Sequence, residues 1–200
     1  MRKYDYEYLK EINEKVKKAL KTSRYIHTQG VRYTAAAMAM KFGEDISKAE
    51  LAGILHDCAK NMDADKMIRI CKKNKIELSQ AELDNHQLLH TKAGYCVAKN
   101  KYEVYDEDIL SAIRFHTTGT SDMTLLEKII FIADFIEPGR CKAPCLDKAR
   151  KAAFEDIDEC MYIILKDTLD YLSSDSKPVD ETTRIAYEFY KDIHEKRSGK

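Results

Sequence analysis

Four histidines and two aspartates are placed so that they could bind metal ions together. They are His27, His56, Asp57, His90, His116 and Asp134. Hydrophobic periodicity assigns them to five separate helices, with His56 and Asp57 sharing one. Inward-facing side chains from several helices of a bundle can converge on one point. Imidazole and carboxylate ligands suit iron, manganese, cobalt or zinc, and two ions sharing one aspartate would use the whole set.

The six residues differ in how strongly each one indicates a metal site. The dipeptide His56-Asp57 is weak alone, because so short a motif occurs often by chance. Asp134 is more informative, since it is the single ionisable residue in the apolar run 129–136. A carboxylate buried there must be hydrogen-bonded, paired or bound to a metal. Two alternatives stay open: Asp134 at a partly hydrated edge, and histidines that are separate structural side chains.

Composition excludes several other classes of protein. Lys and Arg together number 34, as do Asp and Glu, so the net charge of +0 lacks the cationic excess of a nucleic-acid binder. Neither a signal peptide nor an apolar run of 18 residues is found, which predicts a cytoplasmic protein without a membrane span. Six cysteines without a CxxC pair indicate free thiols rather than a disulfide framework or a zinc cluster.

The positioning elements are predicted to be helices throughout. With 200 residues, 7 Gly and 3 Pro, the chain is expected to form one all-α domain, residues 1–200. Ser23 is the expected cap of the second helix, and Ser47 with Glu50 the expected capping box of the third. An opening helix is expected around Tyr8, Ile12 and Val16. The other expected helices, with approximate bounds, are 23–42, 47–60, one from Asp63 or Asp65 to 74, 90–101, one from Asp106 or Asp108 to 116, 123–137 and 146–172, then one from Asp180 after a break at Lys177-Pro178.

Longer strings around the six residues carry a family resemblance. The strings are His27-x-x-x-Val31, Gly53-x-Leu55-His56-Asp57-x-Ala59-Lys60, Leu88-Leu89-His90, Ile113-x-x-His116-Thr117-Thr118-Gly119, and Leu125–Ile129 with Ile132–Arg140. They resemble the HD-domain superfamily of metal-dependent phosphohydrolases, and more narrowly the bacterial YqeK family of symmetrical diadenosine tetraphosphate hydrolases. The resemblance covers residues 22–140. It implies a compact HD-domain bundle, on which the helices of 146–195 would pack.

The resemblance also implies a ligand set. Two divalent ions are expected, iron first, with manganese, cobalt or zinc as alternatives. One ion would be bound by His27, His56, Asp57 and Asp134, and the other by Asp57, His90 and His116, so that Asp57 bridges them. His86 does not match the family pattern and is excluded as a ligand. Two ions sharing a carboxylate suit the hydrolysis of a phosphoester or phosphoanhydride by an activated water.

Several residues near the ligands could bind phosphate. Lys60 follows His56 by four residues, so on a helix it would share the metal-facing side, and with Asp57 it is the expected catalytic pair. Arg140 could grip a phosphate with a bidentate fork, and the turn Thr117-Thr118-Gly119 could cradle another oxygen. Arg24 and Arg114, close in sequence to His27 and His116, are weaker candidates and are expected to be salt-bridged surface residues.

The expected activity is cleavage of diadenosine tetraphosphate into two ADP. A nucleotidase or nucleoside triphosphate phosphohydrolase of the same superfamily is the alternative, because the metal site leaves the leaving group open. A non-catalytic nucleotide-binding module and an all-α structural adaptor are the candidates from other classes. The expected partners are the nucleotide substrate and product, with a homodimer as the candidate assembly and no nucleic acid or membrane.

Overall fold

The computed structural model describes residues 4–174 and 179–199, apart from the side chains of residues 84, 86 and 174. These residues form helices and turns with no strand among them, which confirms the all-α prediction. The expected break at Lys177-Pro178 and the side chain of His86 lie outside the described part. The helices are α1 (Tyr6–Ala19), α2 (Thr22–Phe42), α3 (Ile46–Leu55), α4 (Ala64–Lys73), α5 (Gln80–Asp84), α6 (His86–Lys101), α7 (Glu107–Phe115), α8 (Leu125–Ile136), α9 (Leu146–Ala152), α10 (Ile157–Ser174) and α11 (Glu181–Arg197).

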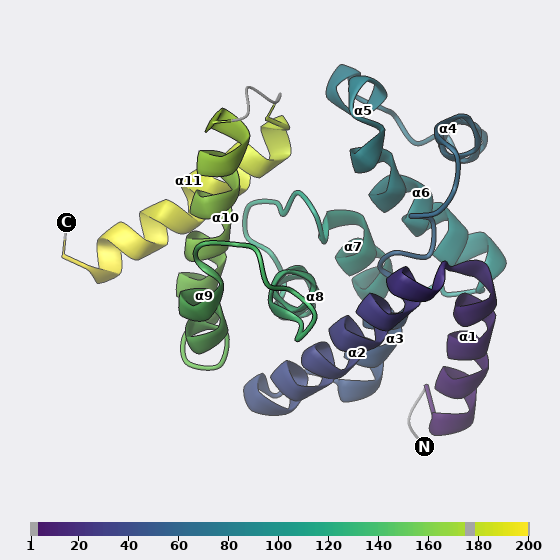
Figure 1. Cartoon of the computed structure of the whole chain (residues 1–200), viewed down its shortest axis with the longest axis horizontal. Coiled ribbons are helices and arrows are strands. Elements are labelled where there is room, and N and C mark those ends of the chain that lie inside the picture. The colour runs from purple at the N-terminus through teal and green to yellow at the C-terminus, as the bar shows by residue number, and fades with distance from the viewer. Residues whose placement is uncertain (1–3, 175–178, 200) are drawn as a thin grey trace.

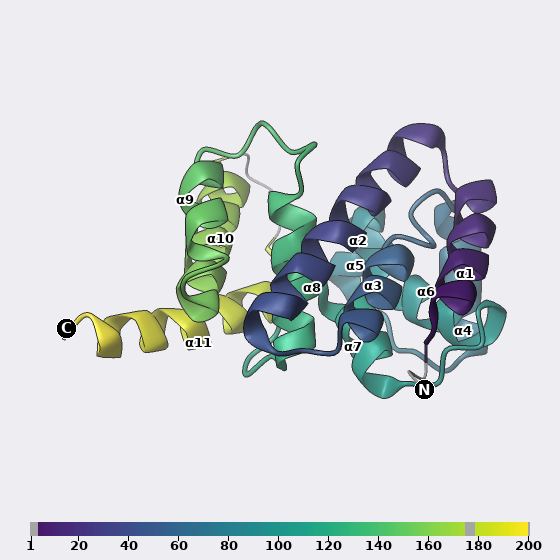
Figure 2. The same cartoon turned by 90° about the horizontal axis from the view of Figure 1, so that it is seen from below.

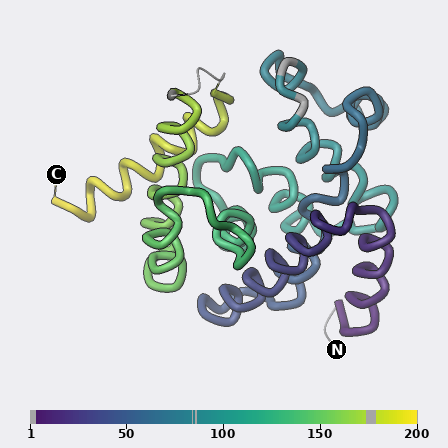
Figure 3. The backbone as a smooth tube through the Cα atoms, viewed as in Figure 1, coloured from purple at the N-terminus to yellow at the C-terminus, as the bar shows by residue number. Residues whose placement is uncertain are grey.

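Helix α8 lies between two groups of helices. On one side α2 packs along α3, α3 packs on α7, and α7 on α6, while α2 and α7 both contact α8. On the other side α9, α10 and α11 form a second group that reaches the rest of the chain chiefly through α8 (Figures 1 and 2). The two ends of the chain therefore lie on opposite sides of the molecule (Figure 3). The residues of the predicted site come from the first group and the turns after its helices, and from α8 and the segment that follows it.

Two predicted helix boundaries are wrong for reasons of capping. Helix α3 begins at Asp45 rather than at a Ser47–Glu50 capping box, because the Asp45 carboxylate accepts hydrogen bonds from the N–H groups of Ser47 and Lys48 at 2.8 and 3.1 Å. Glu50 instead binds Arg32 of α2 at 2.7 Å. Similarly, α2 begins at Thr22 after Lys21, so Ser23 lies inside the helix and does not cap it.

The single helix predicted over 146–172 is two helices. α9 ends at Ala152, and turns separate it from α10. The carboxylate of Asp156 accepts hydrogen bonds from the N–H groups of Asp158 and Glu159, both at 3.1 Å, and so caps the new helix. The cap was readable in the sequence, but the continuous apolar periodicity concealed it.

The cysteines and the helix lengths agree with expectation. All six cysteines are free, which confirms the prediction of unpaired thiols, and four of them are buried. No described helix combines the length and the apolar character that a crossing of the bilayer needs.

The contact between α2 and α3 yields a prediction about stability. A Cβ atom at Gly53 would lie 2.9 Å from Cα of Arg32, a backbone atom that cannot move aside alone. Gly53→Ala is therefore expected to lower the free energy of unfolding by about 1–3 kcal/mol, measured by urea titration, even though alanine favours a helix more than glycine does. Gly94→Ala is the control, because the nearest atom there is a side-chain methyl carbon of Ile113 at 3.3 Å, farther away than the backbone atom at Gly53. Equal losses for the two variants would contradict the prediction.

Candidate metal centre

Four imidazole rings meet where α2, α3, α6 and α7 come together. His27 lies in α2 and His90 in α6, while His56 and His116 follow the last residues of α3 and α7. Nε2 of His27 lies 3.3 Å from Nε2 of His56, and Nε2 of His90 lies 3.1 Å from Nε2 of His116. All but His27 are buried. The four residues predicted to act together therefore do converge, as two close pairs.

Hydrogen bonds at the other ring nitrogen orient all four histidines. Each Nδ1 faces a carbonyl or carboxylate oxygen, which can only accept a hydrogen bond. In each neutral ring Nδ1 therefore carries the proton, and Nε2 keeps a lone pair. The acceptors are the carbonyl of Gly53 for His56 at 2.7 Å, that of Ile113 for His116 at 2.8 Å, that of Gln87 for His90, and the carboxylate of Glu137 for His27 at 3.0 Å. Four lone pairs thus point at a common centre, an arrangement suited to metal binding.

Two of these orientations arise because the histidines cap their own helices. The sequence predicted that α3 would continue to Lys60, but it ends at Leu55 and a series of turns follows. His56 and His116 each donate to the carbonyl three residues earlier, which would otherwise lack a partner at the end of the helix. The helix end therefore fixes the ring and aims Nε2 inward.

Asp57 joins the two pairs of histidines. Its Oδ1 lies 3.3 Å from Nε2 of His90 and 3.6 Å from Nε2 of His116, while Oδ2 lies 3.4 Å from Nε2 of His56. Burial by itself raises the pKa of this carboxyl, but His56, His116 and His90 outweigh it and hold the pKa well below its usual range. The group is a carboxylate whose two oxygens face different pairs of imidazoles.

Two observations show that the residues of this cluster fit a bound cation. Oδ1 of Asp57 is buried and accepts no hydrogen bond from any described residue, which is costly for a charged oxygen. The same atom faces unprotonated nitrogens, which offer it no proton. Two groups each have ligand atoms within 4.8 Å of one another, namely His27, His56 and Asp57, and Asp57, His90 and His116. A cation in each group would satisfy the oxygens and the lone pairs together.

Asp134 lies at the edge of the first group. Its Oδ1 is 2.9 Å from Nε2 of His27 and 4.0 Å from Nε2 of His56, and it also binds Nη2 of Arg140 at 2.7 Å. Burial opposes ionisation of Asp134, but the adjacent His27 and the nearby His56 and Arg140 lower its pKa. The one carboxylate of the apolar run on α8 is thus paired rather than bare.

The predicted phosphate-binding residues are only partly brought together. Nζ of Lys60 lies 3.2 Å from Nε2 of His90, and burial lowers the pKa of this ammonium. Lys60 reaches the cluster from a turn, with its N–H donating to the Asp57 carbonyl at 2.9 Å, and not from a helix face as predicted. The Arg140 side chain is 45% exposed and reaches the edge of the cluster, where it binds Asp134.

The residues of the turn after His116 differ in whether their polar groups face the cluster. Oγ1 of Thr117 lies 3.4 Å from Nε2 of His90, so this hydroxyl faces the cluster. Oγ1 of Thr118 donates to the carbonyl of Gly119 at 3.0 Å. The N–H of Gly119 donates to the carbonyl of Phe115 at 2.9 Å, and its φ of +66° closes the end of α7. Gly119 is buried against Ala186 of α11, so its N–H is not free to bind a phosphate.

The sequence ranked one functional candidate too low and missed another. Arg24, a weaker candidate expected in a salt bridge at the surface, does form a salt bridge, but its Nη1 binds Oδ2 of Asp57 inside the cluster at 2.7 Å. Glu137 is buried at the end of α8, where Oε1 accepts from His27 and Oε2 accepts from the N–H of Gly139 at 2.6 Å. The available signal was an acidic residue three positions after Asp134, immediately before Pro138-Gly139. Arg114, expected in a salt bridge, has a buried Nε without a described partner.

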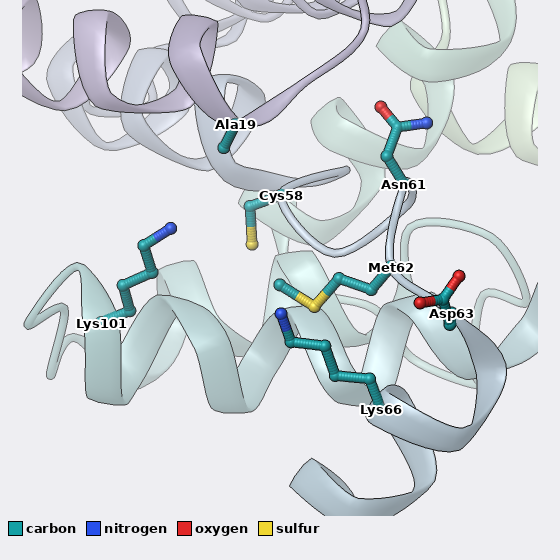
Figure 4. Close-up of a pocket in the computed structure, with 7 residues that line it drawn as sticks. All are labelled: Ala19, Cys58, Asn61, Met62, Asp63, Lys66 and Lys101. Atoms are coloured by element: carbon teal, nitrogen blue, oxygen red, sulfur yellow. The ribbon is translucent and has the colours of Figure 1, made fainter.

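A separate cavity of about 240 Å³ contains none of the cluster residues (Figure 4). The thiol of Cys58 and the side chains of Met62, Lys66 and Lys101 line it, together with Ala19, Asn61 and Asp63. Lys66 makes no ion pair with any described residue. It therefore offers a lysine outside the cluster that can serve as a control for Lys60.

The fold and the site identify the class of this protein. The HD domain family matches residues 24–139, which hold all six predicted ligands. The chain belongs to the HD domain family. The crystal structure of a predicted HD superfamily hydrolase involved in NAD metabolism from Clostridium acetobutylicum is 38% identical, superposes with a TM-score of 0.88, and covers 92% of this chain and 97% of its own.

Within the family, two similar relatives that extend over most of this chain carry the same name. The symmetrical bis(5'-nucleosyl)-tetraphosphatase of Bacillus subtilis is 41% identical over 172 residues, which cover 86% of this chain and 91% of the relative. The protein of the same name from Halalkalibacterium halodurans is 40% identical over 174 residues, with the same coverage of 86% and 91%. The similarity therefore extends well beyond the motifs of the site.

Proposed function

We propose that this protein hydrolyses diadenosine tetraphosphate symmetrically into two ADP, using a metal-activated water. The observation that carries the proposal is the arrangement at Asp57, where each carboxylate oxygen faces a different pair of Nε2 lone pairs. Such an arrangement suits two cations that share one carboxylate. The names of the similar relatives supply the substrate class.

The ligand assignment follows the two groups of side chains. His27, His56, Asp57 and Asp134 would hold one ion, and Asp57, His90 and His116 the other. Iron is proposed as the native metal, with manganese, cobalt or zinc as alternatives, because imidazole and carboxylate ligands accept all four. When bound, two divalent ions lower the pKa of a shared water and neutralise phosphate oxygens.

The remaining residues would bind and orient the tetraphosphate. Lys60 and Thr117 both lie beside His90 and would donate to phosphate oxygens there. Arg140 would do so at the rim beside Asp134. Water adds to one of the two inner phosphorus atoms, the bond from that phosphorus to the central bridging oxygen breaks, and the leaving group departs as the second ADP. Thr118 stays a weaker candidate, and Gly119 would act by shaping the turn.

Metal content and product identity test this function together. The purified protein is expected to contain about two metal ions per chain, since a dimetal site requires them. Incubated with diadenosine tetraphosphate in ¹⁸O-water, it should release only ADP, with one of the two ADP molecules labelled. Orthophosphate released from ATP or from a nucleoside monophosphate would favour the nucleotidase or triphosphatase alternative. Nucleotide binding without turnover would favour a non-catalytic module.

Lys60 gives a prediction about substrate binding. Lys60→Ala is expected to lower kcat/KM by about tenfold to a hundredfold, because a charge-assisted hydrogen bond to phosphate is lost. Metal content should stay unchanged, since an ammonium donates no lone pair to a metal. Lys66→Ala, in the separate cavity, should leave kcat/KM unaltered. An unchanged kcat/KM in Lys60→Ala would remove Lys60 from the site.

The other expectations stay proposals. They are a single domain over residues 1–200 with its core at 22–140 and the helices of 146–195 packed upon it, a homodimeric assembly, a cytoplasmic location and no nucleic-acid partner.

A further inference from the structure

An arginine contacts one oxygen of each aspartate in the cluster. Arg24 lies in α2, three residues before His27, and its Nη1 donates to Oδ2 of Asp57 at 2.7 Å. Nη2 of Arg140 donates to Oδ1 of Asp134 at the same distance. Nε2 of His27 lies 3.8 Å from the first of these oxygens and 2.9 Å from the second. Each guanidinium group therefore pairs with an aspartate that lies beside His27.

The arginines mark the side of the cluster that reaches solvent. Asp57 and three of the histidine side chains are at most 2% exposed, whereas the Arg24 side chain is 30% exposed and that of Arg140 is 45% exposed. A phosphate that approaches the buried ligands from solvent must therefore pass these two cations. Lys60, next to His90, is also only partly buried.

The Arg24 guanidinium has hydrogen-bond donors that no described residue uses. Its guanidinium makes one hydrogen bond to the described residues, through Nη1, and leaves Nε and the second amino group without a partner among them. A guanidinium presents five N–H donors in a planar fork that matches a phosphate. The contact with Asp57 uses a small part of this capacity.

Metal binding and the Arg24 contact use the same carboxylate. Oδ2 of Asp57 is the oxygen that faces His27 and His56, so it is the one the first ion would use. A carboxylate bound to a divalent ion has less negative charge to offer a guanidinium. We propose that Arg24 is a phosphate-binding residue of this site, held by Asp57 in the metal-free protein and released to the substrate when a divalent ion takes that carboxylate.

This proposal rests on the proposed function and deepens it. Because Arg24 and Arg140 pair with different aspartates of the cluster, they would contact different phosphates of one tetraphosphate chain. A substrate with two equivalent halves presents a diphosphate to each side of the bond that breaks. Arg24 would thus supply, on the Asp57 side, the contact that Arg140 supplies on the Asp134 side.

The test measures Mn²⁺ and ADP binding by calorimetry for the full chain and for Arg24→Ala and Arg24→Lys. Loss of the competing ion pair should tighten Mn²⁺ binding in Arg24→Ala by about threefold to tenfold. ADP binding to the Mn²⁺-loaded protein should weaken about tenfold or more in Arg24→Ala and less in Arg24→Lys. Without Mn²⁺ the three proteins should bind ADP equally weakly. Arg184→Ala, which removes an exposed arginine of α11 paired with Glu181, should match the unchanged protein throughout.

Each result decides the proposal. Weaker Mn²⁺ binding in both Arg24 variants would make Arg24 a structural support of Asp57 and overturn it, as would unchanged ADP binding in the loaded protein. Because ADP binding requires no turnover, the proposal can stand if the protein cleaves another nucleotide. Conversely, symmetrical cleavage with an unaltered KM in Arg24→Ala would refute the role of Arg24 and leave the proposed function intact.

Discussion

Asp57→Asn is expected to lower turnover of diadenosine tetraphosphate by at least about a thousandfold, because Asp57 would be a ligand of both proposed metal ions. An asparagine keeps the shape but has one neutral oxygen, so it cannot neutralise two cations. Its amide nitrogen would also face one pair of Nε2 lone pairs and could occupy the place of an ion. Metal content should fall from about two ions per chain to fewer than one. The measurements are kcat at saturating metal and metal analysis after gel filtration.

A matched substitution separates loss of the site from loss of the fold. Asp158→Asn removes an aspartate of α10, outside the cluster, that binds Lys128 at 2.7 Å and Arg197 at 3.0 Å. It should retain metal and turnover. Circular dichroism should show that Asp57→Asn remains helical, since removing a buried charge does not create a cavity. Full metal content with full turnover in Asp57→Asn would show that the bridging role is wrong.

Glu137→Gln is expected to weaken metal binding by about tenfold to a hundredfold through His27. The two carboxylate oxygens of Glu137 accept from two different donors, Nδ1–H of His27 and N–H of Gly139. A glutamine has one acceptor oxygen, so its amide nitrogen must face one of these N–H groups and lose that hydrogen bond. His27 would then be free to turn or to change tautomer. Calorimetric titration with Mn²⁺ measures the loss.

A substitution at Gly30 can displace the Glu137 side chain without replacing its carboxylate. A Cβ atom at Gly30 would collide with the carboxylate of Glu137, and one at Gly139 would lie 3.0 Å from it. Gly30→Ala should therefore displace Glu137 and reproduce the weaker metal binding. Glu50→Gln is the control, because Glu50 pairs with Arg32 outside the cluster. Unchanged Mn²⁺ affinity in both Glu137→Gln and Gly30→Ala would show that Glu137 does not position His27.

Much of this protein could be predicted from local patterns. Helical periodicity identified the class, because burial of an apolar face repeats every three to four residues along the chain. The isolated Asp134 in the apolar run of α8 signalled a paired carboxylate, because a bare charge is too costly in such surroundings. The predicted helix boundaries were less accurate, because Asp45 and Asp156 cap the starts of α3 and α10, and hydrophobic periodicity does not report capping contacts.

The sequence by itself determined which residues could bind metal and that helices would carry them. The tertiary structure alone decided how the rings are turned, because the acceptors that fix Nδ1 include helix-end carbonyls and Glu137, which lies 110 residues from His27. It also decided that Arg24 reaches Asp57 across 33 residues. Contacts between distant segments depend on how helices pack, and spacing along the chain reports only neighbours within one helix.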